Sequence, residues 1–464
     1  MSLIKSVSGI RGTIGGKPGD NLTPIDVVKF VSAYAHLMQK RLNKKHLKII
    51  VGRDARLSGM QVLNLVSGTL SGMGADVVNI GLATTPTTEI TVTEENADGG
   101  IILTASHNPK QWNALKLLNE KGEFLSAEAG KELLQCVEND FDTITYVEID
   151  DIGITTEKDY LQKHIDLVLK DDFVDVEAIK KANFKVAVDA VNSVGGISLP
   201  PLLKALGVEN IIELNCEPTG IFAHNPEPLP ENLTEISEVI KTQKADVGFV
   251  VDPDVDRLAI INEDGSMFGE EYTIVAIADY ILATKPGNTV SNLSSSRALR
   301  DVTEKHGGKY FASAVGEVNV VAKMKETNAV FGGEGNGGVI FPPLHYGRDS
   351  LIGIALFLTH LAKSGKTCSE LRATYPDYHI SKNRVDLTPD TDVDNILLKV
   401  ENKYQGQEDV EISTIDGVKI DFKEGWVHLR KSNTEPIIRI YAESKSYEQA
   451  EEFARLIMND IENL

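Results

Sequence analysis

Short apolar runs alternate with helical stripes along most of the chain. Leu47–Val51 is an apolar run of strand length, and from Ser58 apolar residues recur at helical spacing until Gly74. A second apolar run, Ala75–Ile80, follows, and a third, Gly100–Thr104, ends in a polar turn. This succession predicts a strand, a helix and two further strands in the first part of the chain.

The same rhythm returns twice in the middle of the chain. We expect strands near Phe184–Asp189, Asn210–Leu214, Asp246–Val251, Leu258–Asn262 and Thr289–Leu293, and helices near Gly195–Leu206, Glu231–Lys241, Tyr272–Leu282 and Arg297–His306. The strand at Leu258–Asn262 would open the third round. Strands that alternate with helices predict βαβ units and largely parallel sheets.

The C-terminal part has a different pattern, with short alternating segments from about His379. Turn pairs such as Asp416-Gly417 separate these segments and predict an antiparallel sheet. A helical stripe from Tyr447 to Ile461 predicts a last helix packed on the core. A chain of 464 residues corresponds to about three domains, and the change near Pro376–Lys382 adds a fourth. We therefore expect α/β domains at 1–150, 151–256 and 257–374, and a smaller α+β domain at 375–464.

Charge and composition narrow the function. Lys plus Arg number 47 and Asp plus Glu number 68, so the net charge is −21. This balance argues against a nucleic-acid or anionic-membrane partner, either of which needs a basic face, but a small anionic substrate can still bind in a local basic pocket. Three scattered cysteines cannot form a disulfide framework. With no signal-peptide pattern and no apolar run of about 18 residues, we expect a cytoplasmic protein.

The first loop with chemical potential, Thr104–Pro109, follows an apolar strand. Ser106 lies in a polar turn at the strand end where open α/β sheets bind ligands, so it is either a nucleophile or a plain turn residue. His107 and Asn108 can hydrogen-bond a group carried on its oxygen. Lys116 can neutralise a phosphate or move a proton, unless it is an ordinary solvated lysine.

The second loop carries carboxylates at alternate positions, Asp252, Asp254 and Asp256, followed by Arg257. Such carboxylates can converge on a divalent cation, and Mg²⁺ fits because few protein ligands leave positions for a substrate phosphate. A calcium-binding helix–loop–helix is the alternative, since Glu263 falls at its twelfth position. Against it, Arg257 stands where that loop needs glycine, and the flanking segments are strand-like.

Two further loops offer groups suited to a sugar phosphate. Gly332–Gly338 is dense in glycine, which lets backbone approach a ligand closely, and its Glu334 and Asn336 suit sugar hydroxyls; a tight turn is the alternative. Arg430–Pro436 and Arg439 hold guanidinium, hydroxyl and amide donors, the donor set of a phosphate clamp, although the segment alone could be an exposed basic turn.

Together the four loops supply a hydroxyl nucleophile, a hard-metal site, a hydroxyl-binding loop and an anion clamp. Phosphoryl transfer needs these parts, because its transition state spreads negative charge over phosphate oxygens. Phosphate monoesters hydrolyse extremely slowly without catalysis, so a serine without metal and cationic support would not suffice. The residues predict phosphoryl transfer on a phosphorylated polyol.

The four loops, in this order, resemble those of the α-D-phosphohexomutase family over essentially the whole chain. Ser8–Gly12 resembles the family's opening motif, and Ser-His-Asn-Pro together with Asp-x-Asp-x-Asp-Arg is a highly specific combination. The resemblance implies three similar α/β mixed-sheet domains and a smaller C-terminal α+β domain around a central cleft. These domains would carry the phosphoserine, metal, sugar-binding and phosphate-binding loops in turn.

The resemblance also implies roles for individual residues. Ser106 would carry the phosphoryl group and, with Asp252, Asp254 and Asp256, ligate Mg²⁺. The rest of the catalytic set would be Lys116 as a general acid/base, Arg257 and Arg11 on the reacting phosphate, and His107. The substrate-binding residues would be Glu334, Asn336, Arg430, Ser432, Asn433, Thr434 and Arg439.

The implied activity is that of an isomerase that interconverts the 6-phosphate and 1-phosphate of a hexosamine or hexose through a bisphosphorylated sugar, which also serves as activator. The glycine loop resembles that of phosphoglucosamine-type members, which favours glucosamine 6-phosphate over glucose or mannose phosphates. Gly338 stands where many relatives have His, a second acid/base, and leaves His345 or Glu317 as candidates. A Mg²⁺-dependent phosphatase and a non-catalytic binding protein are the other hypotheses; we expect a monomer or homodimer.

Overall fold

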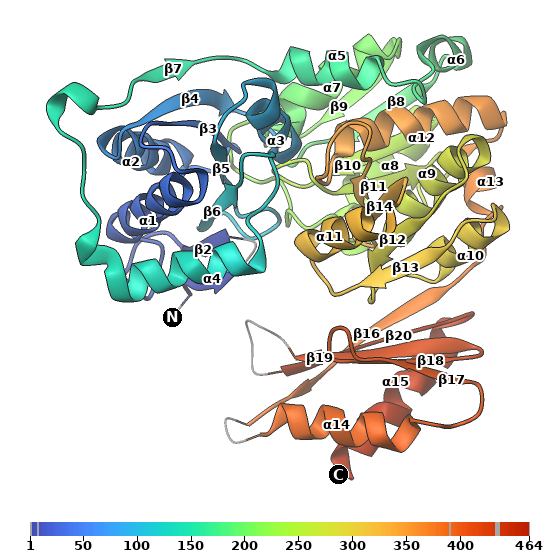
Figure 1. Cartoon of the computed structure of the whole chain (residues 1–464). Helices are drawn as coiled ribbons and strands as arrows, with labels where there is room; N and C mark the ends of the chain where they lie inside the picture. Colours follow the sequence, from blue (N-terminus) through green and yellow to red (C-terminus); the bar gives the residue numbers. More distant parts are fainter. Residues whose placement is uncertain (1, 7–8, 389–390, 432–436, 464) are drawn as a thin grey trace. The chain divides into compact units, whose positions relative to one another are not determined.

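The computed structural model describes residues 2–6, 9–388, 391–431 and 437–463 (Figure 1). The chain divides into two compact units. Unit 1 comprises Met1–Thr273 and Asn336–Leu371, and unit 2 comprises Ile274–Gly335 and Arg372–Leu464. The expected four-domain α/β architecture with mixed sheets is confirmed, with two sheets in unit 1 and the strands of the other two domains largely in unit 2.

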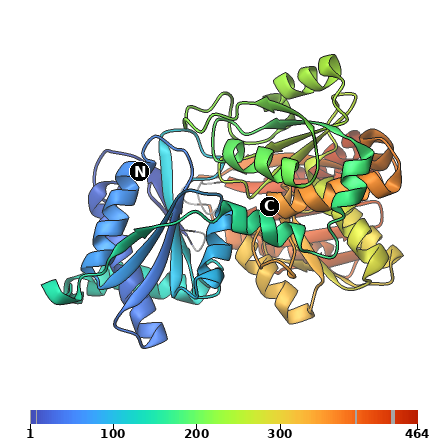
Figure 2. The ribbon, with the colours of Figure 1, turned by 90° about the horizontal axis from the view of Figure 1, so that it is seen from above.

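The first domain is built on a seven-stranded sheet of order β1-β2-β6-β5-β3-β4-β7 with helices on both faces (Figure 1, Figure 2). In the order of the sheet, the pairs β1–β2, β2–β6 and β6–β5 are antiparallel. The pairs β5–β3, β3–β4 and β4–β7 are parallel. Its elements are β1 (Ile4–Ser6), β2 (Gly9–Thr13), α1 (Pro24–Leu42), β3 (Leu47–Arg53), α2 (Gly59–Gly72), β4 (Ala75–Leu82), α3 (Thr85–Glu94), β5 (Gly99–Leu103), β6 (Trp112–Leu118), α4 (Ala127–Gln135) and β7 (Thr155–Glu157).

The second domain has a four-stranded sheet of order β11-β10-β8-β9. Its elements are α5 (Leu161–Leu169), α6 (Val176–Ala182), β8 (Lys185–Asp189), α7 (Gly195–Ala205), β9 (Asn210–Leu214), α8 (Thr234–Gln243), β10 (Val247–Val251) and β11 (Leu258–Asn262). The strand β11 differs from expectation, because it pairs antiparallel with β10 and so completes this sheet instead of opening the next. The short loop between β10 and β11 forces this hairpin, and that loop carries the three aspartates.

The third domain contributes a parallel arrangement of β12 with β13 and β14 to unit 2. Its elements are α9 (Glu270–Thr284), β12 (Thr289–Asn292), α10 (Ala298–Lys305), β13 (Tyr310–Ser313), α11 (Glu317–Thr327), β14 (Phe331–Glu334), β15 (Gly338–Ile340), α12 (Ser350–Ser364) and α13 (Cys368–Arg372). The helix α12 belongs to unit 1, where Phe357 packs edge-to-face on Phe249 and Phe268.

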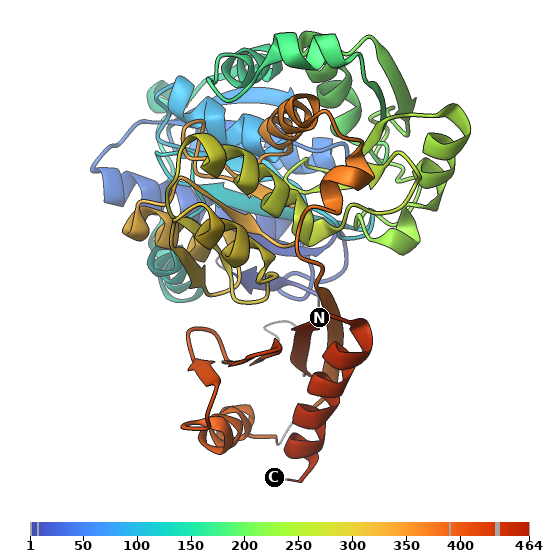
Figure 3. The same cartoon turned by 90° about the vertical axis from the view of Figure 1, so that its right-hand side faces the viewer.

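The fourth domain is an antiparallel sheet of order β16-β20-β19-β18-β17, with α14 and α15 on one face (Figure 1, Figure 3). Its elements are β16 (His379–Asp386), α14 (Val393–Tyr404), β17 (Val410–Ser413), β18 (Val418–Phe422), β19 (Gly425–Lys431), β20 (Ile437–Ser444) and α15 (Tyr447–Glu462). Ala450, Ala454 and Ile457 of α15 are buried in the core, as the apolar stripe predicts. In the described part of the chain, no helix combines the length and apolar character needed to span a membrane.

Candidate active site

Ser106 lies just beyond the C-terminal end of β5, in the loop after this buried strand. Its backbone has φ +48°, a left-handed conformation that is uncommon for a residue other than glycine. The side chain is buried, and its Oγ donates a hydrogen bond of 2.6 Å to Asp252 Oδ2. His107 Nδ1 lies 3.3 Å from the same Oγ. The strand ends therefore bring together two loops that are far apart in the sequence.

The three aspartates after β10 form the metal-binding candidate. Asp252, Asp254 and Asp256 are fully buried, and one oxygen of each lies within 4.8 Å of the others. Among the described residues, Oδ1 of Asp254 and Oδ1 of Asp256 have no hydrogen-bond partner. Converging, buried carboxylate oxygens without donors fit a hard divalent cation such as Mg²⁺, and three carboxylates leave coordination positions for phosphate oxygens.

Local hydrogen bonds hold the metal loop in shape. Asp252 Oδ1 accepts from the backbone N–H groups of Asp256 and Arg257, at 3.2 and 3.1 Å. Burial, together with repulsion from Asp254 and Asp256, raises the pKa of Asp252 well above its ordinary value. The calcium alternative is wrong, because strands flank the loop and Glu263 instead accepts hydrogen bonds from Ser369.

Lys116 projects from β6 into the aspartate cluster and is only 6% exposed, so it is not a solvated lysine. Its Nζ lies 2.6 Å from Asp254 Oδ2 and 3.1 Å from Asp256 Oδ2. Burial alone lowers the pKa of Lys116, but the two carboxylates outweigh burial and raise it above its ordinary value. The amine is therefore held in its charged form and donates hydrogen bonds to the triad.

Arg348, which the sequence analysis did not select, joins the same cluster. Its guanidinium donates to Asp256 Oδ2 at 2.7 Å, and Arg348 is buried. A Cβ atom at Gly338 would lie 2.3 Å from Arg348 Cδ, so the arginine occupies the space beside this glycine. Burial and repulsion from Arg257 and Arg348 lower the pKa of Arg11, which places the three arginines within electrostatic reach of one another.

His107 is neutral in this environment. Burial, followed by repulsion from Arg257 and Arg11, lowers the pKa of His107 to about 2. Its ring can therefore hydrogen-bond but does not add charge at neutral pH. On its outer side, Glu227 lies 3.9 Å from His107 and 3.7 Å from Arg257.

The two residues predicted to bind sugar hydroxyls are partly engaged within the protein. Glu334, at the end of β14, is buried and accepts from the side-chain amide of Asn292 at 2.9 Å and from the N–H of Gly316 at 3.1 Å. Asn336 Oδ1 accepts from the N–H of Gly338 at 3.2 Å, which closes the glycine turn.

The phosphate-clamp candidates belong to the fourth domain. Arg430 on β19 pairs directly with Arg439 on β20, which in turn pairs with Arg384 on β16. Directly opposed residues share a face of an antiparallel sheet, so three arginines form a row across neighbouring strands. Ser432, Asn433 and Thr434 lie outside the described residues.

The candidates for a second acid/base differ in their surroundings. The His345 side chain is only 11% exposed, with Nε2 3.2 Å from Asp349 and Nδ1 3.3 Å from Glu89. Burial lowers the pKa of His345, but the two carboxylates outweigh this effect and raise it to about 10. His345 is thus a charged member of an ion-pair network. Glu317 is buried at the start of α11.

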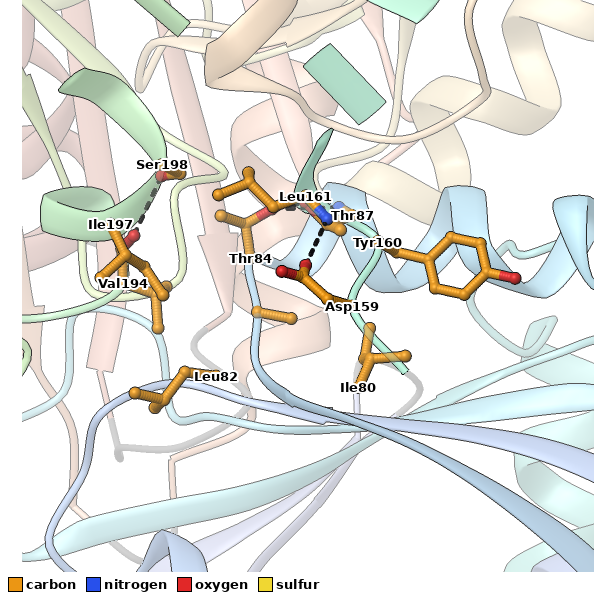
Figure 4. A pocket seen from close by; sticks show the side chains of 11 residues that line it. Ile80, Leu82, Thr84, Thr87, Asp159, Tyr160, Leu161, Val194, Ile197 and Ser198 are labelled. Atoms are coloured by element: carbon orange, nitrogen blue, oxygen red, sulfur yellow. Dashed lines mark hydrogen bonds between the residues drawn. The ribbon is translucent and has the colours of Figure 1, made fainter. Parts of the chain in front are cut away.

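A small cavity in unit 1 is separate from these groups. It has a volume of about 10 Å³ and is lined by Leu82, Thr84, Thr87, Tyr160, Ile197 and Ser198 among others (Figure 4). Such a volume holds about one water molecule. The Ser198 hydroxyl already donates to Val194 O at 2.9 Å, so the cavity is not a substrate site.

Two residues outside the predicted set, Asp54 and Arg56, also support the Ser106 loop. Both are buried and follow β3, the neighbour of β5 in the sheet. A signal was present, because charged residues directly after an apolar strand lie at the ligand-binding edge of an α/β sheet.

Comparison with known proteins agrees with this geometry. Profiles of the three alpha/beta/alpha domains and the C-terminal domain of phosphoglucomutase/phosphomannomutase match residues 3–143, 162–265, 269–378 and 393–459. A phosphoglucomutase/phosphomannomutase of Thermococcus kodakarensis is 38% identical over 452 residues, 96% of each chain. A phosphoglucosamine/phosphogalactosamine mutase of Sulfurisphaera tokodaii is 34% identical over 470 residues, 100% of this chain and 99% of that protein.

A solved structure shows the same fold. The crystal structure of a phosphoglucomutase/phosphomannomutase family protein from Burkholderia thailandensis superimposes with a TM-score of 0.84 at 25% identity, over 99% of this chain and 98% of that one. Four domain profiles in order, relatives matched along their whole length, and a buried serine beside three aspartates lead to one conclusion. The chain belongs to the phosphoglucomutase/phosphomannomutase family and is a phosphohexomutase.

Proposed function

We propose that this enzyme converts glucosamine 6-phosphate to glucosamine 1-phosphate through a phosphorylated Ser106 and a bisphosphorylated sugar. The observation that carries the mechanism is the 2.6 Å hydrogen bond from Ser106 Oγ to Asp252 Oδ2. This contact supports a mechanism in which Ser106 is the nucleophile, Asp252 accepts its proton and the aspartate cluster binds a cation. A serine serving only as a turn residue would not need this arrangement.

Proton transfer accompanies each phosphoryl transfer. When Ser106 attacks a phosphate of the bisphosphorylated sugar, the Oγ–P bond forms and its proton leaves toward Asp252. The bond between phosphorus and the sugar oxygen breaks, and Lys116 gives that oxygen a proton. The reverse transfers then phosphorylate the other hydroxyl, with its proton passing to Lys116 and Asp252 returning a proton to Oγ. The two halves balance, so no phosphate is lost.

Asp252, Asp254 and Asp256 would hold Mg²⁺, with a phosphoserine oxygen as a further ligand. When bound, the ion would supply positive charge that stabilises the transferring phosphoryl group. Arg11, Arg257 and neutral His107 would orient the same group through hydrogen bonds. Arg430, Arg439, Ser432, Asn433 and Thr434 would hold the phosphate that does not react, and Glu334 and Asn336 would contact sugar hydroxyls.

The names of the relatives bear on which sugar is the substrate. Several relatives are named probable phosphoglucosamine mutases, among them those of Methanopyrus kandleri and Pyrococcus horikoshii. The 38% identical relative is named phosphoglucomutase/phosphomannomutase, which favours glucose or mannose phosphates as the second candidate.

A side-by-side assay tests the proposal. Glucosamine, glucose and mannose 6-phosphates would each be supplied with Mg²⁺ and a trace of the matching bisphosphate, and 1-phosphate and free phosphate would be measured. We expect kcat/KM to be highest for glucosamine 6-phosphate, with no steady phosphate release. A higher kcat/KM for glucose or mannose phosphate would show that this sugar phosphate, and not glucosamine 6-phosphate, is the preferred substrate. Steady phosphate release would show that the enzyme acts as a phosphatase and not as a mutase.

A further inference from the structure

The guanidinium of Arg56 binds the serine loop at four points. Arg56 is 1% exposed and donates to the carbonyl oxygens of Ser106 and Asn108, each at 2.6 Å. It also donates to those of Pro109 at 2.8 Å and Trp112 at 2.9 Å. One planar group thus fixes the backbone from the serine to the start of β6, and only a guanidinium has the forked donors to do so.

Asp54 and Thr104 connect Arg56 to the backbone N–H of Ser106. Asp54 Oδ2 accepts from Arg56 Nε at 3.0 Å and from the Thr104 hydroxyl at 2.6 Å. The same Thr104 oxygen accepts from the Ser106 N–H at 3.0 Å. Both the amide and the carbonyl of Ser106 are therefore fixed by a single buried network.

This network explains how Ser106 keeps a left-handed backbone. A residue other than glycine is strained in this region and persists there only where its surroundings over-determine it. With φ +48°, Ser106 meets that description. Because its N–H and C=O are both held, its Cα–Cβ bond has a fixed direction, and Oγ is aimed at Asp252.

Segment 54–56 also contacts the metal loop. The Ser193 hydroxyl donates to Pro253 O at 2.7 Å and accepts from the Ala55 N–H at 3.4 Å. On its outer face Arg56 is covered by the ring of Phe222, with the guanidinium carbon 5.1 Å from the ring centroid. The segment that positions Ser106 is thus tied to the loop that carries the aspartates.

We propose that Arg56 is a positioning residue, which acts through Asp54 and Thr104 to hold Ser106 in line for phosphoryl transfer. This inference rests on the proposed function, in which Ser106 carries the phosphoryl group. Arg56, Asp54 and Thr104 are not among the residues proposed to bind the sugar phosphate, so loss of the network should change the geometry of the nucleophile and leave the sugar-binding groups in place. A displacement of about 1 Å at a reacting atom can lower a rate by about 100-fold.

Two conservative variants test the proposal. Arg56→Lys keeps the positive charge but loses the planar set of N–H donors. Thr104→Val keeps the shape of the side chain but loses the hydroxyl. We expect kcat to fall about 100-fold for Arg56→Lys and about tenfold for Thr104→Val, with KM for the sugar phosphate within about threefold of the wild type. The matched controls are Arg41→Lys, which alters an exposed ion pair with Glu132, and Thr91→Val, which removes a buried hydroxyl that donates to Thr87 O within α3.

Chemical rescue separates positioning from a general loss of stability. Arg56→Ala leaves a buried space of guanidinium shape, and guanidinium chloride at a concentration well below its denaturing range should raise the kcat of this variant about tenfold or more. Urea at the same concentration should not. Arg41→Ala should respond to neither compound. If Arg56→Ala does not fold, the kcat of Thr104→Val decides the question.

Wild-type kcat in both Arg56→Lys and Thr104→Val would overturn the proposal. So would a loss of activity that follows the loss of thermal stability and is not rescued by guanidinium in a folded Arg56→Ala. Failure of the underlying mechanism would look different: the wild type would never carry phosphate on Ser106, whatever the Arg56 variants do.

Discussion

The serine and aspartate cluster in unit 1 and the arginine row in unit 2 differ in how their charges are arranged. In unit 1, Lys116 and Arg348 each lie within 3.1 Å of a buried carboxylate of the triad. In unit 2, Arg430, Arg439 and Arg384 stand next to one another across three strands. Like charges opposite one another destabilise a sheet, so this row favours a bound anion.

This difference in charge arrangement suggests that the unit 1 cluster acts in the chemical step and that the arginine row acts in substrate binding. Paired, buried charges are already oriented before the substrate arrives, which is the arrangement that stabilises a transition state. In a row of neighbouring cations, such as half-buried Arg430 and Arg439, the gain comes when a phosphate binds, whichever step the reaction has reached. Changes in the first region should therefore lower kcat, and changes in the second should raise KM.

The largest expected effect is that of Asp254→Asn. It removes a carboxylate whose Oδ1 faces no donor among the described residues and whose Oδ2 pairs with Lys116. We expect kcat to fall by about 1,000-fold, equivalent to about 4 kcal/mol, and Mg²⁺ affinity measured by calorimetry to fall with it. Asp264→Asn, in the exposed turn after β11, is the control. If Asp254→Asn bound Mg²⁺ with wild-type affinity, the assignment of the triad as the metal site would be wrong.

A smaller effect is expected from the arginine row. Arg430→Ala removes a charge-assisted hydrogen bond and should raise KM about 10- to 100-fold with little change in kcat. Arg384→Ala, at an exposed position beside Asp386, should raise KM only a few-fold, because solvent screens its charge. Steady-state kinetics at two salt concentrations would measure both. A fall in kcat larger than the rise in KM for Arg430→Ala would contradict the division between the two regions.

The last prediction concerns stability rather than catalysis, and here too the two units differ. In unit 1, Asp349 and Glu89 outweigh burial and raise the pKa of His345 to about 10. In unit 2, burial lowers the pKa of His428 to about 4. The stabilisation from charged His345 is complete below about pH 6.5 and is lost as the pH rises through about 10, whereas that from neutral His428 is complete above about pH 6.5 and is lost toward pH 4.

Denaturant unfolding of His345→Gln and wild type at pH 7 and pH 10.5 tests the first half of this statement. The wild type should lose up to a few kcal/mol more than the variant between the two pH values. His46→Gln, which removes an exposed histidine beside Asp76, is the control. Equal losses in wild type and His345→Gln would mean that His345 is not charged in the folded protein.

Local patterns in the sequence predicted most of the fold and the four loops. Helix α3 was not predicted because half of its residues are threonines, so it shows no apolar stripe. The burial of these threonines depends on partners such as Asp254 and His164. Strand β11 was assigned to the third domain instead of the second, because an apolar run does not reveal which strand it pairs with. In the candidate site, short motifs selected Ser106 and the aspartates, which the structure brings together. They could not identify Arg348 or Arg56, whose roles depend on contacts with residues 92 and 50 positions away.

The central claim is that Ser106 carries the phosphoryl group. Its most direct test is peptide mass spectrometry of the wild type after incubation with glucosamine 1,6-bisphosphate and Mg²⁺, then again after excess glucosamine 6-phosphate. We predict one phosphate on Ser106 in the first sample and its loss in the second. Ser106→Ala should carry no phosphate and have no mutase activity. Phosphate on another residue, or wild-type-like turnover by Ser106→Ala, would contradict the account.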